Sequence, residues 1–388
     1  MAARPPGSRR GPIVVIAPMP PAYRGGTEEY AYRLVQRYSA SEPVRVVTTV
    51  VRSEGKDPLS VGSADVISIG AREIFERPLV TGAAARRALK AAVDSAWVVQ
   101  LHMPFPFVER RVTRWARRAG VPVVLTYHMD AEFGDGLGAR LVTRAYRGLS
   151  ARPALARCDA VVSNSLGYGK ASPVLSRVLP KVRVIYQGID PERLVVPPGS
   201  PPLLTPSDPA AKKVVFIGRL VGYKGVPYLL DAIAELRRAG DNVELFVAGK
   251  GPLLAELTAR AAALGLGASV HFLGFVPDDA LGRLYREAGV VASPSVSLLE
   301  STPITLMEAM ACGTPVVGTT LPGTEETIPN DGERGLLVPP RDAAALAHAL
   351  RRLLAAPRPT GTPPVRTWDD TARDYLALFH GLAGGGTR

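Results

Sequence analysis

Short apolar runs alternate with longer amphipathic stretches along the first half of the chain. Runs of this length, separated by stretches with apolar residues at helical spacing, are typical of a parallel sheet covered by helices on both faces. The runs are Ile13–Ala17, Val44–Thr49, Val66–Ile69, Val98–Leu101, Val123–Thr126, Ala160–Ser163 and Val182–Tyr186, and helices are predicted at Glu28–Tyr38 and Val108–Ala119 among others.

The alternation restarts after a proline-rich segment, Leu194–Ala211. We expect this segment to be a linker, because proline fits neither a helix interior nor a central strand. A second segment rich in proline and threonine, Ala356–Val365, precedes a last helix at about Asp369–Leu382. The predicted strands of this half are Val214–Ile217, Val243–Ala248, Val270–Leu273, Val290–Ala292, Val316–Gly318 and Gly335–Val338. The predicted helices are Val226–Ala239, Leu253–Leu264, Asp279–Ala288, Thr305–Ala311 and Ala343–Leu354.

The pattern therefore predicts an α/β protein of two doubly wound domains, residues 1–193 and 212–366, joined by residues 194–211. Ligands in such sheets bind at the carboxyl ends of the strands, where the strand order reverses. The cleft between the two domains is the expected site, and residues 194–211 are the expected hinge for closure around a ligand.

Composition narrows the class of protein. No apolar run approaches the ~18 residues of a membrane-spanning helix, and Cys158 and Cys312 are too few for a disulfide scaffold. The proline-broken run near the N-terminus is typical of a buried strand rather than of a signal peptide, so we expect a cytoplasmic location. The net charge of +12 favours an anionic partner, unless it reflects an arginine-rich genome. With 6% aromatic residues and no base-stacking motif, nucleic acid is the weakest candidate partner.

Two glycine-containing turns carry candidate chemistry. Gly25-Gly26-Thr27-Glu28 lies between the first strand and a helix, where free backbone N–H groups can meet an anion, although such a pair is also ordinary turn chemistry. Gly218–Gly225 follows the first strand of the second half and contains Arg219 and Lys224. These two cations could converge on a diphosphate, or they could be surface charges of a basic protein.

A third motif spans Glu300–Val317 and contains two carboxylates, Glu300 and Glu308. Glu308 falls within an apolar helical stretch, where a charge is costly unless it is bonded, and sugar hydroxyls could satisfy it. Thr302 to Thr305 lie where that helix begins, so their N–H groups could meet a phosphate. Alternatively, Glu300 is an exposed loop charge and Glu308 a helix-surface glutamate.

Together these motifs resemble the retaining glycosyltransferases of family four, which have the GT-B fold. The resemblance rests on G-R-L-x-x-x-K-G at 218–225, on E-x₇-E at 300–308, and on Glu308–Val317, and it extends over nearly the whole chain. Residues 25–28, 270–277, 293–295 and 335–340 are also similar to family segments, and Gln187-Gly188-Ile189-Asp190 stands where the family has Asn-Gly-Val-Asp. The resemblance implies that residues 367–388 form a helix that crosses back to the first domain.

The resemblance also implies roles for individual residues. Arg219 and Lys224 would hold the donor diphosphate, Glu308 the ribose hydroxyls and Glu300 the sugar hydroxyls. His128 would meet the sugar from the first domain. Further donor-side candidates are Gly26, Gly218, Phe272, Gly274, Phe275, Ser293, Ser295, Thr302, Pro303, Ile304 and Thr305. Acceptor-side candidates are Gly25, Glu28, His102 and Asp130. Packing is the alternative role for the two histidines.

The implied reaction moves a hexose from a nucleoside diphosphate sugar to an acceptor hydroxyl with retention of configuration. No metal or cofactor is expected, since cations and helix dipoles could stabilise the leaving diphosphate. Where the family often has Glu-Gly-Phe-Gly, this chain has Glu300-Ser301-Thr302-Pro303, which leaves the donor sugar open. The rivals are a nucleotide-sugar epimerase, a non-catalytic nucleotide-sugar-binding protein, a pyridoxal phosphate-dependent phosphorylase and a glycosyltransferase of secondary metabolism.

The acceptor side of the sequence is similar to bacterial mannosyltransferases that make polysaccharides or lipid-linked saccharides. The residues concerned are 102–107, 127–130 and 171–175. A basic stripe formed by Arg110, Arg111, Arg114, Arg117 and Arg118 lies on one side of the predicted helix Val108–Ala119. Such a stripe could contact an anionic membrane from the cytoplasmic side, or it could be a solvated face.

Overall fold

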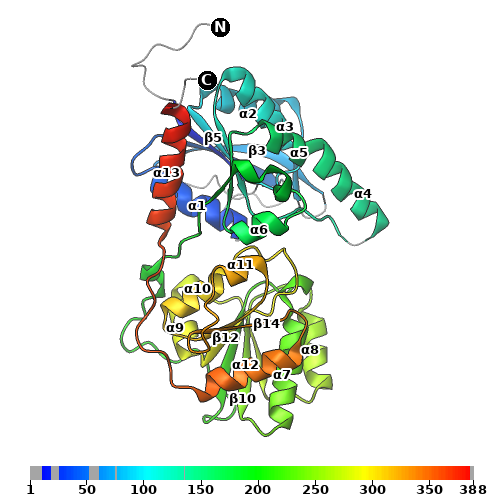
Figure 1. Cartoon of the computed structure of the whole chain (residues 1–388), viewed down its shortest axis with the longest axis vertical. Helices are drawn as coiled ribbons and strands as arrows, with labels where there is room; N and C mark the ends of the chain where they lie inside the picture. The colour runs from blue at the N-terminus through cyan, green and yellow to red at the C-terminus, as the bar shows by residue number, and fades with distance from the viewer. Residues whose placement is uncertain (1–10, 19–25, 52–60, 75–76, 135, 385–388) are drawn as a thin grey trace. The chain divides into compact units, whose positions relative to one another are not determined.

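The computed structural model describes residues 11–18, 26–51, 61–74, 77–134 and 136–384, and the chain folds into two compact units. Unit 1 comprises residues 1–186 and 368–388, and unit 2 comprises residues 187–367. Each unit is an α/β domain built on one sheet (Figure 1). The predicted α/β class with two doubly wound domains is confirmed.

Unit 1 contains an eight-stranded sheet in the order β4-β3-β2-β1-β5-β6-β7-β8. All its neighbouring strands are parallel except β3 and β4, which pair in the antiparallel sense at one edge. The strands are β1 (Ile13–Ile16), β2 (Val44–Val51), β3 (Asp65–Ile74), β4 (Arg77–Val80), β5 (Val98–Met103), β6 (Val123–Tyr127), β7 (Ala160–Ser163) and β8 (Val182–Val184). The edge strand β4 was not predicted, since its four residues include a proline and only two apolar side chains.

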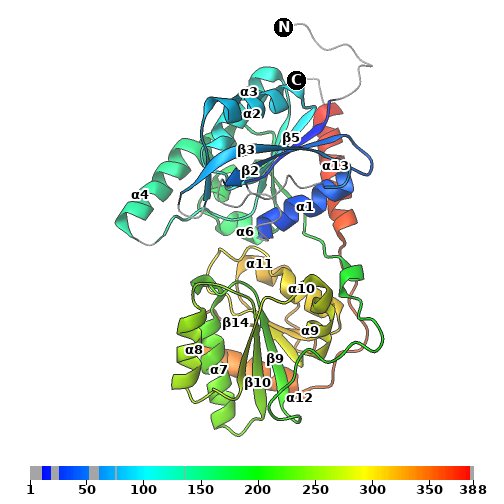
Figure 2. The same cartoon turned by 180° about the vertical axis from the view of Figure 1, so that it is seen from behind.

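Helices cover the sheet of unit 1 on both faces (Figure 2). They are α1 (Gly26–Tyr38), α2 (Ala83–Ser95), α3 (Val108–Ala119), α4 (Leu137–Tyr146), α5 (Arg152–Arg157), α6 (Leu166–Ala171) and α13 (Trp368–Gly384). The π-helical turn Arg147–Ala151 joins α4 to α5 without a break. In α1 the buried residues recur at helical spacing, and Glu28 and Glu29 in its first turn suit the positive end of the helix dipole.

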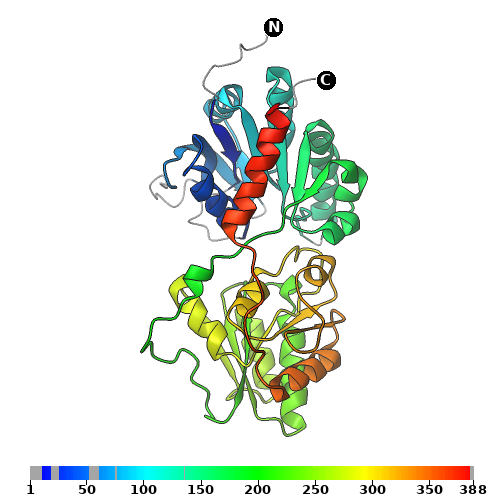
Figure 3. The same ribbon diagram turned by 60° about the vertical axis from the view of Figure 1, so that its left-hand side comes forward.

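Helix α13 lies along α1 although almost the whole chain separates them in sequence (Figure 3). Aromatic rings meet edge to face between them, with centroids 6.4 Å apart for Tyr30 and Tyr375 and 5.7 Å apart for Tyr38 and Phe379. Trp368, Tyr375 and Phe379 are buried. Burying this much aromatic surface fixes the last helix as part of unit 1.

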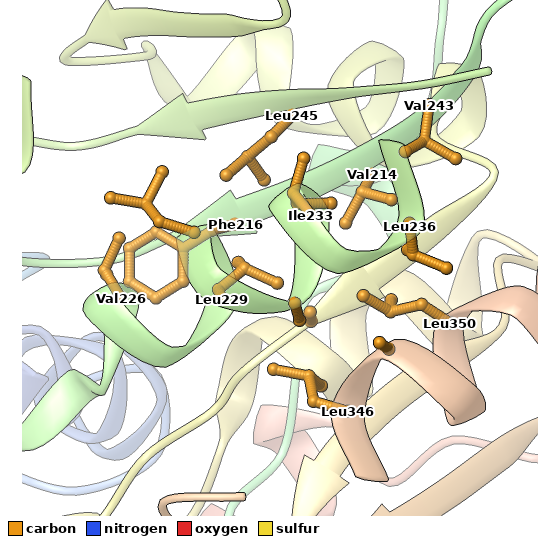
Figure 4. Close-up of a cluster of buried hydrophobic side chains, with 14 of the residues drawn as sticks. Val214, Phe216, Val226, Leu229, Ile233, Leu236, Val243, Leu245, Leu346 and Leu350 are labelled. Carbon is orange, nitrogen blue, oxygen red and sulfur yellow. The ribbon is translucent and has the colours of Figure 1, made fainter. Parts of the chain in front are cut away.

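Unit 2 contains a six-stranded parallel sheet in the order β11-β10-β9-β12-β13-β14. The strands are β9 (Lys212–Ile217), β10 (Val243–Ala248), β11 (Val270–Gly274), β12 (Val290–Ala292), β13 (Val316–Thr319) and β14 (Gly335–Val338). The helices are α7 (Val226–Arg238), α8 (Leu254–Ala263), α9 (Leu281–Glu287), α10 (Ile304–Ala311), α11 (Pro322–Glu325) and α12 (Ala343–Ala355). One side of the sheet packs on α7 and α12 through a core of valines and leucines with Phe216 and Ile233 (Figure 4).

The proline-rich segment 194–211 belongs to unit 2 and is not a free linker. Leu194 and Leu204 are buried in the same core as Leu284 and Tyr285. The Glu287 carboxylate accepts hydrogen bonds from the backbone N–H groups of Leu203 and Leu204 at 2.7–3.0 Å. The expected domain boundary at residue 193 and the expected hinge are therefore corrected. The chain passes between the units at residues 186–187 and 367–368.

A second carboxylate holds the far end of this segment. Glu244 on β10 is buried and accepts hydrogen bonds at 2.9 Å from the backbone N–H groups of Ser207 and Asp208. Burial acts to raise the pKa of Glu244, but these hydrogen bonds and His271 outweigh it, and the net pKa is lowered. The Glu244 carboxylate is therefore ionised at neutral pH and can accept these hydrogen bonds.

Candidate functional site

Several of the predicted donor-side residues of unit 2 gather where the order of its strands reverses. Strands β10 and β11 lie on one side of β9, and β12, β13 and β14 lie on the other. The loop Gly218–Gly225 follows β9, and the segment Ser293–Glu300 follows β12, its immediate neighbour. The carboxyl ends of adjacent parallel strands with crossovers in opposite directions leave room for a ligand.

Close backbone packing fixes the loop Gly218–Gly225. Gly225 has a φ of +69°, and a Cβ atom there would lie 1.9 Å from the carbonyl oxygen of Pro294. A Cβ atom at Gly249 would lie 1.8 Å from the carbonyl oxygen of Gly218. The N–H of Val296 also donates to the carbonyl of Tyr223 at 2.8 Å. The loop is thus positioned by the segments after β10 and β12, and only glycine permits such approach.

Lys224 at the end of this loop forms an ion pair with Glu300. Glu300 is 7% exposed, and its Oε2 also accepts a hydrogen bond from Ser295 Oγ at 2.8 Å. Thr319 Oγ1 donates to the carbonyl of Ser295 at 2.7 Å, which ties this segment to β13. Lys224, Glu300, Ser295 and Thr319 therefore form one connected polar cluster. Glu300 is buried within this cluster and is not an exposed loop charge.

The ion pair keeps Lys224 charged. Burial acts to lower the pKa of the Lys224 ammonium, but the charge and hydrogen bond of Glu300 together with Tyr223 outweigh it, and the net pKa is raised. The positive charge of Arg219 opposes this effect, which shows that the two cations of the loop act on the same region. Arg219 itself is exposed. An anion that approached this loop would meet a fixed ammonium and an exposed guanidinium.

Glu308 on α10 is held by a tyrosine from the adjacent helix α9. Tyr285 is fully buried, and its OH donates to Glu308 Oε2 at 2.7 Å. Burial, followed by the Glu308 charge, raises the pKa of Tyr285 well above its usual value. The phenol therefore stays protonated and acts as a donor, which orients the Glu308 carboxylate. Glu308 is partly buried and bonded, so it is not a plain surface glutamate.

Tyr285 is in turn anchored through its backbone. Thr314 Oγ1 donates to the carbonyl of Tyr285 at 2.6 Å, and Arg358 Nη2 donates to Thr314 Oγ1 at 2.6 Å. The same guanidinium reaches the carbonyls of Arg286, Ala288 and Gly313 at 2.8–3.1 Å. Arg358 thus fastens the segment after α12 to the ends of α9 and α10.

The remaining predicted donor-side residues are spread over this edge of the sheet. Phe272 on β11 packs against the core below α7, whereas Phe275 is 48% exposed. Gly274 adopts a φ of +68° at the end of β11. Ser293 Oγ lies 3.4 Å from Ser295 Oγ. Pro303 precedes the first turn of α10, which contains Ile304 and Thr305, and the Thr302 hydroxyl donates to the carbonyl of Ser301.

The two candidate histidines of unit 1 are in direct contact. His102 lies near the carboxyl end of β5, and His128 follows β6 directly. The distance between His102 Nδ1 and His128 Nε2 is 2.9 Å. Their rings stack with centroids 5.2 Å apart. Both are buried, and among the described residues His102 Nε2 has no hydrogen-bond partner. Burial lowers the pKa of His128 to about 3, and burial followed by the His128 charge lowers the pKa of His102 well below its usual value.

The histidine pair rests on an aromatic and polar support. Tyr30 packs edge to face on both rings, at centroid distances of 6.1 and 5.0 Å. Its OH donates to Asn164 Oδ1 at 3.1 Å and lies 3.2 Å from Tyr375 OH. The last helix of the chain therefore helps to place His102 and His128.

Other acceptor-side candidates have different environments. The two carboxylate oxygens of Asp130 accept from Tyr127 OH at 2.9 Å and Tyr168 OH at 3.1 Å, so Asp130 holds the segment after β6 in place. The acceptor-side candidate Glu28 lies in the first turn of α1, and Gly26, which was predicted on the donor side, is the first residue of that helix. Gly25 lies outside the described residues.

Sequence reasoning missed three side chains that organise the site: Tyr285, Thr319 and Arg358. Tyr285 lies 23 residues before Glu308, and no local pattern links the two. An aromatic residue in an amphipathic helix is normally assigned to the core, which is where its ring lies. Its hydroxyl function depends on the packing of α9 against α10, which is a tertiary property.

Comparison with known proteins covers nearly the whole chain. Residues 205–370 match the family of glycosyl transferases group 1, and residues 24–193 match glycosyltransferase family 4. D-rhamnosyltransferase WbpZ of Pseudomonas aeruginosa is 33% identical over 272 residues, which are 70% of this chain and 67% of that protein. O-antigen chain mannosyltransferase C of Escherichia coli is 28% identical over 333 residues, 85% of this chain and 84% of that protein.

Solved structures share the fold at lower sequence identity. Anabaena Alr3699/HepE in complex with UDP superposes with a TM-score of 0.64 at 17% identity, covering 96% of this chain and 97% of that one. Likeness at this identity concerns the fold alone.

Proposed function

This chain belongs to the group 1 glycosyltransferases of family 4, which have the GT-B fold, and from that premise we propose that it transfers a hexose from a nucleoside diphosphate sugar to a saccharide acceptor carried on a lipid, with retention of anomeric configuration. The observation that carries the proposal is the polar cluster of unit 2. It combines the cationic loop Gly218–Gly225 with two oriented carboxylates, Glu300 and Glu308, at a strand-order reversal.

The cluster suits each part of such a donor. Lys224 and Arg219 would neutralise the charge that develops on the diphosphate as the glycosidic bond breaks. The carboxylates of Glu308 and Glu300 can accept hydrogen bonds from ribose and sugar hydroxyls, respectively. The departing phosphate oxygen would take the proton of the attacking acceptor hydroxyl on the same face, which accounts for retention. We propose that His128 contacts the donor sugar as a neutral imidazole, in keeping with its lowered pKa.

The metal independence, the hexose class and the lipid carrier are parts of the proposal. Lys224 and Arg219 would supply the electrostatic stabilisation that a divalent ion provides in other transferases. The similarity to a D-rhamnosyltransferase and to an O-antigen chain mannosyltransferase supports a mannose-like donor.

We further propose that the basic stripe on α3 contacts an anionic membrane. Arg110, Arg114, Arg117 and Arg118 are exposed there, and Arg111 is half-buried. Among the described residues, no helix is long and apolar enough to cross a bilayer.

A thermal-shift panel tests the donor site. UDP, GDP, ADP and their sugars are compared with and without EDTA, and the matching nucleotide at 100 times its Kd is expected to raise Tm by about 5 °C or more. The shift should persist in EDTA and disappear in the Arg219→Ala variant. A shift that EDTA abolishes would contradict metal independence, and the absence of any shift would contradict the donor site.

The reaction class is tested by adding acceptor. Turnover should require a saccharide acceptor, and NMR of the product should show the anomeric configuration of the donor. Epimerised nucleotide sugar formed without acceptor would instead identify an epimerase.

Tyr285→Phe is expected to weaken nucleotide binding about tenfold. The variant loses the hydrogen bond from the Tyr285 hydroxyl that orients the charged Glu308 carboxylate. Binding constants for the ribonucleotide and its 2′- and 3′-deoxy analogues measure the effect. Discrimination between ribose and deoxyribose should fall in Tyr285→Phe and remain intact in Tyr228→Phe, a control on α7. Equal loss of affinity for all analogues would mean that Tyr285 acts only on stability.

A further inference from the structure

Large apolar side chains project into solvent along one continuous helical segment of unit 1. Leu137 and Leu141 on α4 are 81% and 68% exposed, and Leu149 on the π-helical turn that follows is 56% exposed. In Figures 1 and 2, α4 reaches outward beyond α3 and α5. Leu137 and Leu141 are four residues apart, so they lie on the same face of the helix. Isolated exposed leucines are ordinary, but three on one projecting segment form a surface that needs an apolar partner.

Arginines border these leucines. Arg140 and Arg144 are exposed on α4 itself, and no aspartate or glutamate occurs between Leu137 and Leu149. Helix α3 packs against the π-helical turn, and Arg110 Nη1 of its basic stripe lies 3.4 Å from the carbonyl of Leu149. The exposed arginines of α3 therefore continue the positive charge of α4. Glu109, the acidic residue of α3, is buried and accepts from Phe105 N, Tyr146 OH and Ser150 Oγ, so its charge faces inward.

We propose that Leu137, Leu141 and Leu149 insert into the interfacial layer of an anionic lipid bilayer while Arg140, Arg144 and the stripe on α3 contact its headgroups. Apolar side chains projecting from a helix flanked by arginines match a bilayer surface, which offers an apolar interior below a layer of negative charge. A purely anionic partner such as nucleic acid would leave the leucines in water. A purely apolar partner would leave the arginines unpaired.

This surface deepens the proposed function, since an acceptor carried on a lipid presents its hydroxyl beside the bilayer. It also adds a feature that the basic stripe alone lacks. Headgroup attraction by arginines weakens with salt, whereas inserted leucines retain binding at higher ionic strength. The leucines of α4 thus anchor the protein, and the arginines select anionic membranes.

Vesicle flotation with the full-length chain tests the proposal. Wild type is expected to bind vesicles of phosphatidylcholine with phosphatidylglycerol at least about tenfold more tightly than vesicles of phosphatidylcholine alone. The double variant Leu137→Gln/Leu141→Gln should lose at least about tenfold in affinity for the anionic vesicles. The double variant Arg140→Gln/Arg144→Gln should lose the preference for anionic lipid.

Matched controls separate this surface from general stickiness and from the donor site. Leu254→Gln on α8 removes a leucine that is 39% exposed in unit 2, and Arg237→Gln/Arg238→Gln removes two exposed arginines from α7. Both should bind vesicles as wild type does. The nucleotide thermal shift should be unchanged in every α4 variant, because the donor site lies in unit 2.

Two results for the Leu137→Gln/Leu141→Gln variant would overturn the proposal. One is wild-type vesicle binding by the Leu137→Gln/Leu141→Gln variant. The other is a wild-type dimer that this variant converts to a monomer, which would assign the leucines to a contact between two copies of the chain. Nucleotide binding without vesicle binding would remove this inference and leave the donor site standing. Vesicle binding without any nucleotide-induced thermal shift would support this inference and contradict the donor site.

Discussion

Lys224→Met is expected to lower kcat/KM for glycosyl transfer by about two to three orders of magnitude, because removing one preorganised donor to a developing charge costs about 3–4 kcal/mol. The ammonium is fixed by its ion pair with Glu300 at the end of a loop that close packing at Gly225 holds rigid. Steady-state kinetics with saturating acceptor measure the effect. Lys90→Met, which removes a lysine paired to Asp94 on the exposed face of α2, should retain wild-type kinetics.

Loss of stability must be separated from loss of catalysis in this variant. Lys224→Met leaves the Glu300 carboxylate, 7% exposed, without its cation, and this costs about 3 kcal/mol of folding free energy. The double variant Lys224→Met/Glu300→Gln removes the unpaired charge, so its Tm should recover while kcat/KM stays low. Recovery of activity together with Tm would show that Lys224 serves the fold and not the reaction.

Lowering the pH from 7 to 5 is expected to reduce the free energy of unfolding of unit 1 by about 4 kcal/mol through His102 and His128. Burial lowers the pKa of His128 to about 3 and that of His102 well below its usual value. Both histidines take up protons in the unfolded chain below about pH 6.5, while the folded state stays neutral. Stability is therefore lost progressively as the pH falls from about 6.5 towards 3.

Tryptophan fluorescence during denaturation at several pH values isolates this effect, because all three tryptophans, Trp97, Trp115 and Trp368, belong to unit 1. The double variant His102→Gln/His128→Gln should have a shallower pH dependence than wild type. His348→Gln, on the exposed side of α12, serves as the control. An equally steep dependence in the double variant would assign the acid sensitivity to carboxylates elsewhere in unit 1.

Most strand positions could be predicted from the sequence, because a strand that is buried on both faces consists of consecutive apolar residues. Thirteen of the fourteen strands in the described residues overlap predicted runs. Strand β4 lies at a sheet edge and lacks this signal. Helix α4 was not among the helices named from the sequence, and within it Tyr146 is the residue that is buried.

Long-range packing accounts for what the sequence could not predict. The prolines of residues 194–211 indicated a linker, but the carboxylates that hold this segment are Glu244 and Glu287, which lie far along the chain on β10 and α9. The contact between His102 and His128 depends on the pairing of β5 with β6. Tyr285 reaches Glu308 only once α9 and α10 are packed. Motifs identified the chemical groups of the site, whereas their supports became visible only in three dimensions.

The position of α13 has a consequence for synthesis on the ribosome. Unit 2 is continuous in sequence, and all of its residues are synthesised before those of α13. Unit 1 begins first but is completed only after unit 2 has been synthesised, because Trp368, Tyr375 and Phe379 cover the aromatic face of α1 and follow unit 2 in sequence. The nascent first unit therefore exposes Tyr30 and Tyr38 throughout elongation, and a chain that stops before α13 keeps that surface open. The unit that contains the two buried histidines is therefore completed only after every residue of unit 2 has been added to the chain.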